Sequence, residues 1–206
     1  ASSPWPRWRA RRDLQGRTTQ AGPTAANPPT GTFTTDSPIK GSPAIDASGN
    51  VLIGSFDFKL YSLAPSDSGF SSTPNWTFFT GDYVSSTPVV DSGGYIYFGS
   101  QNGIFYKLAN SGATVWSFSA GDAIESSANL STANAIFGCD DGKVYAVDRA
   151  TGALSWVYNI GGEVKGSPAY DNGKIYVGST NGMLVALNAA DGTLVWSQNL
   201  GTPLYA

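Results

Sequence analysis

The stretch AVDRATGALSW, residues 146–156, decides the fold, because related stretches recur on both sides of it at a fixed spacing. Trp156 has counterparts 40 residues away at Trp116 and Trp196, and a further step of 40 residues towards the N-terminus reaches Trp76. Four of the six tryptophans therefore hold the same position in a repeat. A period of about 40 residues indicates an array of structural units that stack on one another.

Each unit contains four apolar stretches separated by turn residues. In the third unit these stretches are residues 126–131, 135–139, 143–147 and 155–158. The third stretch alternates as a half-buried strand does. Asp141-Gly142 joins the second stretch to the third and predicts a tight hairpin with positive φ at both residues, whereas the first unit has Phe56-Asp57-Phe58 at this place. We predict an all-β chain with four antiparallel strands per unit, as in a propeller blade.

The repeat places the four blades at about residues 36–80, 81–120, 121–160 and 161–206. One indole at the same place in every blade predicts a packing role for these side chains. Burying a tryptophan ring contributes about 4–6 kcal/mol as an upper bound. The tryptophans are therefore expected to hold the blades together.

The composition excludes several classes of function. Residues 1–35 carry five arginines and one acid, a net charge of +4, whereas residues 36–206 carry seven basic and fourteen acidic groups, a net charge of −7. The acidic body argues against a nucleic-acid partner. Histidine, the commonest general base and metal ligand, is absent, and the single cysteine permits no internal disulfide. No apolar run approaches the roughly 18 residues that span a bilayer, so we expect a soluble chain.

Residues 1–35 show neither a strand period nor a helix period and are rich in Pro, Thr, Ala and Arg. We predict an irregular arm. Its arginines are typical of transit peptides, and Arg11-Arg12 faintly matches a twin-arginine export signal, but no apolar segment follows. A solvated or partner-bound arm is the simpler interpretation. Trp5 and Trp8, beside prolines and arginines, are candidate partner contacts.

The run Ala146-x-Asp148-x-x-Thr151-Gly152-x-x-x-Trp156 resembles the tryptophan-docking motif of the PQQ-like β-propeller repeat family. This family includes quinoprotein dehydrogenases and the periplasmic scaffold lipoprotein of the outer-membrane assembly machinery. The resemblance covers residues 36–206 and implies that the indole packs between neighbouring blades. It also implies a location outside the cytoplasm, in the periplasm, secreted or in an organelle. From the residues themselves, Asp148 is expected to bond within its own turn, towards Thr151 and Gly152.

Propellers of this family usually close with seven or eight blades, so four blades predict a partial or half propeller. An open arc exposes apolar sheet faces, which soluble proteins avoid. We therefore expect a second copy, or another protein chain, to complete the ring to about eight blades or to cap it. A closed ring of four blades is the alternative.

The sequence gives little support for catalysis. A quinoprotein dehydrogenase holds PQQ and Ca²⁺ on the ring axis, often beside an adjacent-cysteine pair, whereas Cys139 stands alone in a slot that is serine in the other units. We interpret Cys139 as a small buried strand residue. Asp140-Asp141-Gly142 is followed by no spaced set of oxygen ligands, so it is interpreted as a turn and not as a calcium loop. The recurring strand-end acids, residues 46, 91 and 171, are interpreted as structural, with convergence on one rim to bind a cation as the alternative.

We therefore expect a non-catalytic PQQ-like propeller that acts as an interaction scaffold or accessory subunit, with no catalytic, cofactor or metal residues. The alternative is a PQQ-dependent dehydrogenase, or a propeller that senses a quinone or sugar-like ligand. Contacts with partners are expected on loops that depart from the repeat. These are the arm and the insertion of residues 65–74, in which Phe70 is a candidate contact.

Overall fold

The computed structural model describes residues 32–66 and 69–205, and it confirms the all-β prediction. Trp5 and Trp8 lie outside the described residues.

The first blade contains β1 (Ala44–Ile45), β2 (Val51–Gly54), β3 (Lys59–Leu63) and β6 (Trp76–Phe79). The second contains β7 (Val89–Val90), β8 (Ile96–Gly99), β9 (Ile104–Leu108) and β10 (Thr114–Ser119). The third contains β11 (Asn129–Leu130), β12 (Asn134–Gly138), β13 (Lys143–Asp148) and β14 (Leu154–Asn159). The fourth contains β15 (Ala169–Asp171), β16 (Lys174–Gly178), β17 (Met183–Asn188) and β18 (Leu194–Asn199).

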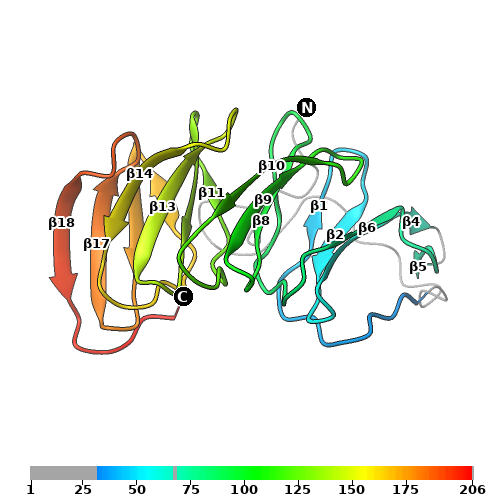
Figure 1. The fold of residues 1–206 in the computed structure, drawn as a ribbon, viewed down its shortest axis with the longest axis horizontal. Helices are drawn as coiled ribbons and strands as arrows, with labels where there is room; N and C mark the ends of the chain where they lie inside the picture. Colours follow the sequence, from blue (N-terminus) through cyan, green and yellow to red (C-terminus); the bar gives the residue numbers. More distant parts are fainter. Residues whose placement is uncertain (1–31, 67–68, 206) are drawn as a thin grey trace, which may run out of the picture.

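Each blade is an antiparallel meander in which every strand pairs with the next one of its blade. The four sheets stand face to face in a row that starts at the first blade and ends at β18 (Figure 1). All six residues of β18 are exposed, so the row is an open arc and not a closed ring of four. Over the described residues no helix is long and apolar enough to cross a membrane.

The hairpins between the second and third strands correct one sequence expectation. In the turns at Asn102-Gly103, Asp141-Gly142 and Asn181-Gly182, only the glycine has positive φ. The residue before it acts through its side chain instead: Asp141 Oδ1 accepts a hydrogen bond from the backbone N–H of Lys143 at 3.1 Å. This bond closes the turn without left-handed geometry at the acid. Both residues have positive φ only where the fourth blade turns at Asn172-Gly173, with values of 47° and 77°.

The insertion in the first blade forms a small hairpin of its own. β4 (Pro65–Ser66) pairs antiparallel with β5 (Gly69–Phe70), and the pair stands apart from the four-stranded sheet, at the end of the molecule opposite β18 (Figure 1). Phe70 therefore lies in an extra strand pair that the other three blades do not have.

The core lies between the blades. Apolar residues of one sheet pack against the facing side of the next, as Ile136, Val144 and Trp156 do against Ile175 and Leu187. Equivalent clusters fill the junction between the first and second blades and that between the second and third. Each blade is therefore stabilised by its neighbours, as in other repeat proteins.

Candidate functional site

The tryptophans occupy sockets formed by the next blade along the chain. Trp156 is 7% exposed, and its indole Nε1 donates a hydrogen bond of 3.1 Å to the carbonyl of Ala189 in the fourth blade. The ring lies on Gly192, where an added Cβ would come within 2.6 Å of the indole Cε3. The socket therefore consists of one carbonyl acceptor and one glycine without a side chain.

The same socket recurs at the other two junctions. Trp116 Nε1 donates to the carbonyl of Arg149 at 3.2 Å and its ring lies on Gly152. Trp76 Nε1 donates to the carbonyl of Asn110 at 2.9 Å. Its ring lies on the equivalent glycine of the second blade, Gly112. In the third blade the socket turn is closed by Asp148, whose Oδ1 accepts hydrogen bonds from the backbone N–H and the hydroxyl of Thr151, both at 2.8 Å.

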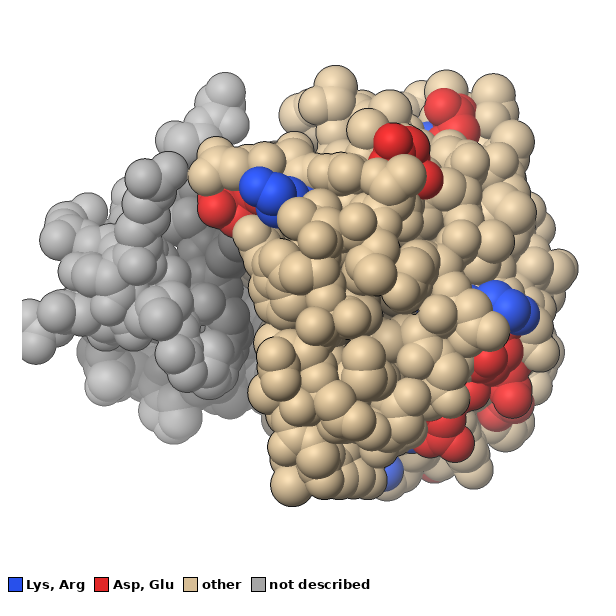
Figure 2. Space-filling model, turned by 90° about the vertical axis from the view of Figure 1, so that its left-hand side faces the viewer, with Lys and Arg blue, Asp and Glu red and all other residues tan. Residues whose placement is uncertain are grey.

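The tryptophan of the fourth blade has no such socket in the described residues. Trp196 is 41% exposed and Leu200 is 48% exposed, whereas their counterparts in the third blade, Trp156 and Ile160, are each 7% exposed. Figure 2 looks onto this end of the molecule and shows a broad surface with few charged side chains. We call it the open face and define it by Trp196 and Leu200. It is the surface by which each preceding blade binds its neighbour.

The opposite end of the arc differs. In the first blade the side turned away from the second blade is covered, with Tyr61 only 4% exposed and the ring of Phe33 centred 5.1 Å from it. The connection between β3 and β6 contains the β4–β5 hairpin where the other blades have a socket glycine. The described residues of the first blade therefore show no socket of the kind that receives an indole elsewhere in the chain.

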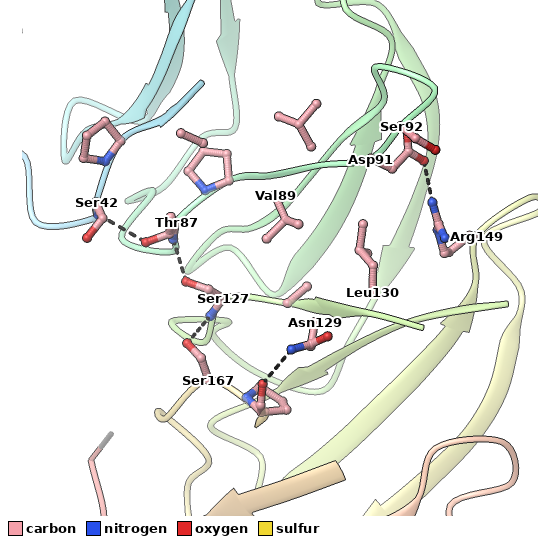
Figure 3. Close-up of a pocket in the computed structure, with 16 residues that line it drawn as sticks. Ser42, Thr87, Val89, Asp91, Ser92, Ser127, Asn129, Leu130, Arg149 and Ser167 are labelled. Atoms are coloured by element: carbon pink, nitrogen blue, oxygen red, sulfur yellow. Dashed lines mark hydrogen bonds and ion pairs between the residues drawn. The ribbon is translucent and has the colours of Figure 1, made fainter. Parts of the chain in front are cut away.

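The segments just before the innermost strands are linked by a ladder of hydrogen bonds to hydroxyl groups. The backbone N–H of Ser42 donates to Thr87 Oγ1 at 3.2 Å, that of Thr87 to Ser127 Oγ at 2.7 Å, and that of Ser127 to Ser167 Oγ at 3.1 Å (Figure 3). Each step joins one blade to the next. The ladder borders an axial hollow of about 740 Å³ that is lined by the first strands and their turns, including Asp91.

An ion pair closes one side of this hollow. Arg149, in the socket turn of the third blade, donates from Nη2 to Asp91 Oδ2 of the second blade at 2.7 Å (Figure 3). Burial of Asp91 opposes its ionisation, but hydrogen bonds from Arg149, Tyr95, Tyr97 and Gly93 outweigh burial and hold the pKa of this carboxyl below its usual value. The single acid that lines the hollow is thus committed to structural bonds.

A buried lysine contacts the backbone of Arg149, one member of this ion pair. Lys107 is 6% exposed, and its Nζ donates to the carbonyl of Arg149 at 2.6 Å and lies 4.1 Å from the centre of the Tyr95 ring. Burial lowers the pKa of Lys107. The rings and the carbonyl satisfy the ammonium group between two blades.

The ion pair makes stability dependent on pH. Because the pKa of Asp91 is lower in the folded state than its ordinary value of 3.8, its contribution is complete above that value and is lost as the pH falls through the folded pKa. We expect the difference in free energy of unfolding between the wild type and Asp91→Asn to shrink as the pH falls below about 4. Urea denaturation at several pH values measures it. A difference that stayed constant down to pH 2 would contradict the assignment.

The other predicted residues lie as follows. Cys139 is fully buried, its thiol donates to the carbonyl of Asp122, and burial raises its pKa to about 11. Asp140 pairs with Lys165 at 2.6 Å, and Asp46 accepts bonds from its own turn at Ser48 and Asn50. Asp171 is exposed and accepts a bond from the amide of Asn172. Over the described ranges no three His, Cys, Asp or Glu side chains gather as a metal site would require.

Sequence reasoning missed two residues of the junction between the second and third blades. Lys107 lies in a strand at a position where the other units carry Ser62, Ala146 and Ala186. Arg149 lies in a turn, at a position that the tryptophan-docking motif does not specify. Only the break in repeat symmetry at these two positions distinguishes them in the sequence.

Four-stranded antiparallel blades, joined by an indole on a glycine turn, define a β-propeller of the PQQ-like repeat type. The model of the family described as "Outer membrane protein assembly factor BamB" matches residues 40–158 and 106–205. The chain belongs to this family. Comparison with curated proteins gives no match.

Solved structures show the same fold. BamB from Moraxella catarrhalis is 19% identical with a TM-score of 0.59, and the alignment covers 82% of this chain and 65% of that one. The quinohemoprotein alcohol dehydrogenase ADHIIG from Pseudomonas putida HK5 is 18% identical with a TM-score of 0.67, covering 82% and 35%. A europium-containing methanol dehydrogenase is 16% identical with a TM-score of 0.72, covering 84% and 44%. The chain thus spans less than two thirds of each of these proteins.

Proposed function

We propose that the chain is a non-catalytic scaffold whose open face binds another protein chain. The observation that carries the proposal is the exposure of Trp196 and Leu200, whose counterparts in the third blade, Trp156 and Ile160, are buried against the fourth blade. An aromatic anchor among aliphatic side chains, on a surface with few charges, is typical of the centre of a protein interface. The similarity to BamB, an assembly factor by its family description, supports the same role.

Another polypeptide fits the open face better than a second copy of this chain docked head to tail. A head-to-tail copy would have to receive Trp196 on its first blade, where the β4–β5 hairpin replaces the socket glycine and Phe33 covers the facing side. A partner that offers a carbonyl acceptor and a flat, side-chain-free surface for the indole meets the requirements seen at the other three sockets.

The similarity to two dehydrogenases supports an alternative function, that of a PQQ-dependent enzyme. The cofactor of such an enzyme would bind in the axial hollow. The residues of the hollow do not fit a quinone with a calcium ion. Calcium needs six to eight oxygen ligands. The single carboxylate among the lining residues, Asp91, already accepts bonds from Arg149 and Tyr97. We therefore derive no reaction step that uses a quinone or a calcium ion at these residues.

The proposed function is tested by measuring the mass and composition of the native particle that contains this chain. Native mass spectrometry of the chain purified at its natural expression level is expected to show a particle containing a second polypeptide. Trp196→Glu places a charge on the open face and is expected to release the chain as a monomer. Tyr170→Thr, which removes an exposed aromatic ring elsewhere in the fourth blade, should leave the particle intact.

Three results would contradict the scaffold. They are a wild-type monomer, a particle composed of two copies of this chain, and a particle that Trp196→Glu does not disturb. Adding PQQ with Ca²⁺ to the purified protein tests the dehydrogenase alternative independently. Saturable binding, followed by absorbance, would favour the dehydrogenase alternative.

A further inference from the structure

The open face is the exposed counterpart of a surface that is buried at the three junctions inside the chain. At the junction between the third and fourth blades, Val144 and Trp156 of the third blade are buried against the fourth. Their counterparts in the fourth blade, Leu184 and Trp196, stay accessible, Leu184 in part and Trp196 to 41%. The chain therefore shows three times what covers this surface, and each time it is the face of another blade.

The segment that follows β18 lies as the connections between blades do. The N–H of Leu204 donates to the carbonyl of Ser179 at 3.1 Å. Its side chain lies over Gly178, where an added Cβ would come 2.6 Å from Leu204 Cδ1. Val164, in the connection from the third blade to the fourth, lies over Gly138 in the same way. The fourth blade thus carries the same arrangement that precedes a neighbouring blade at the other junctions.

The three filled sockets specify a turn in the blade that covers an indole. Each ring lies on the glycine that follows it by 36 residues, and the three glycines, residues 112, 152 and 192, have φ values of 83°, 76° and 72°. An added Cβ on any of them would come within 2.7 Å of the indole. The carbonyl that accepts the indole N–H lies two or three residues before the glycine. Both features belong to one short turn.

The hydroxyl ladder specifies a second contact of the covering blade. At each step a backbone N–H of one blade donates to a hydroxyl group of the next, and the last step runs from Ser127 to Ser167 Oγ at 3.1 Å. Ser167 is exposed, and its own N–H has no acceptor among the described residues. A hydroxyl group on a following blade would continue the ladder.

A helix packed on the open face would not reproduce these contacts. The carbonyls of a helix interior are bonded within the helix, so they are not free to accept the N–H of an indole. A turn with glycine at positive φ leaves the backbone bare, which lets a ring lie directly on it. The geometry at the three sockets therefore favours a turn of this kind over a helical cap.

We propose that the occupant of the open face is a blade of the same repeat type. It receives the Trp196 indole on a turn glycine, accepts the indole N–H with a carbonyl just before that glycine, and places a hydroxyl group against the N–H of Ser167. This inference rests on the proposed function, because it names the partner of the same surface. A scaffold needs only some protein on this face, whereas the inference specifies the fold and the turn which that protein presents.

Photocross-linking from the open face identifies the segment that covers it. Leu200 is replaced by the photoreactive p-benzoylphenylalanine in the chain produced at its natural level. The native particle is then irradiated, and the cross-linked peptide is sequenced by mass spectrometry. We expect a peptide from a repeat of about 40 residues that carries a glycine turn at the socket position. The same replacement at Leu154 is the matched control. Leu154 is also 48% exposed, but it belongs to a blade whose face is already covered, so it should give no link to that repeat.

A second variant tests the carbonyl acceptor. Replacing Trp196 by 3-benzothienylalanine keeps the shape of the fused rings and puts sulfur in place of the indole N–H. We expect the Kd of the particle to rise about threefold to tenfold, the effect of losing one hydrogen bond. Dilution of the particle followed by native mass spectrometry measures it. An unchanged Kd would mean that the occupant offers no acceptor to the indole, which would overturn the proposed socket.

The cross-linked sequence separates this inference from the proposed function. A link to a helix, or to a segment outside any such repeat, would overturn the blade and leave the scaffold standing. A link to a blade of this chain's own sequence would support the blade as occupant and contradict a separate partner. A wild-type monomer that gives no link would contradict both.

Discussion

Replacing Trp156 by alanine is expected to lower the free energy of unfolding by about 3–5 kcal/mol, the range for deleting a large aromatic side chain from a core. The substitution removes an almost fully buried ring from between the third and fourth blades, and it leaves the carbonyl of Ala189 without its indole donor at 3.1 Å. Urea denaturation followed by circular dichroism measures the loss.

Trp196→Ala is the matched control, because the same side chain stands in the same repeat position without a neighbouring blade. With 41% of Trp196 exposed, we expect a loss of about 1 kcal/mol, within the range for a substitution outside a core. Equal losses at the two positions would mean that the interblade socket contributes nothing beyond the packing of the indole on its own sheet.

Replacing Gly152 by alanine is the second change with a large expected effect, a loss of about 2–4 kcal/mol that combines overpacking with an unfavourable φ. An added Cβ would lie 2.7 Å from Cδ2 of the Trp116 indole, and the residue has a φ of 76°. The ring would have to move, which weakens its bond to the carbonyl of Arg149.

Gly142→Ala separates the two causes. Gly142 has a φ of 83°, but the nearest atom to an added Cβ is 3.5 Å away, so only the backbone strain applies. We expect a loss of about 1 kcal/mol at this position. A Gly152→Ala variant no less stable than Gly142→Ala would contradict the account of the socket.

Strand positions could be predicted from the sequence because the repeat supplies the same evidence several times. The third stretch of the third unit, residues 143–147, agrees with β13 to within one residue. The first stretches were predicted too long, as residues 126–131 show against β11 at Asn129–Leu130. The small residues that open each unit form the hydroxyl ladder between blades and not a paired strand.

The site residues were harder to predict because their roles depend on contacts between blades. A tryptophan that recurs every 40 residues indicates packing, but its acceptor at Ala189 is a backbone carbonyl and leaves no trace in the sequence. Phe58 was noted as a break in the hairpin pattern, yet only the structure shows that its ring contacts Phe79, at the end of β6, and Tyr83, in the connection that follows β6.

The polar junction between the second and third blades has a consequence for the order in which the blades assemble. A chain of similar repeats can dock its members wrongly while it folds. If the fourth blade docked on the second in place of the third, Ala189 would stand where Arg149 belongs, and Asp91, with a side chain only 9% exposed, would lose its guanidinium partner. Since an unpaired buried charge is strongly destabilising, this ion pair favours the third blade over the fourth as the neighbour of the second.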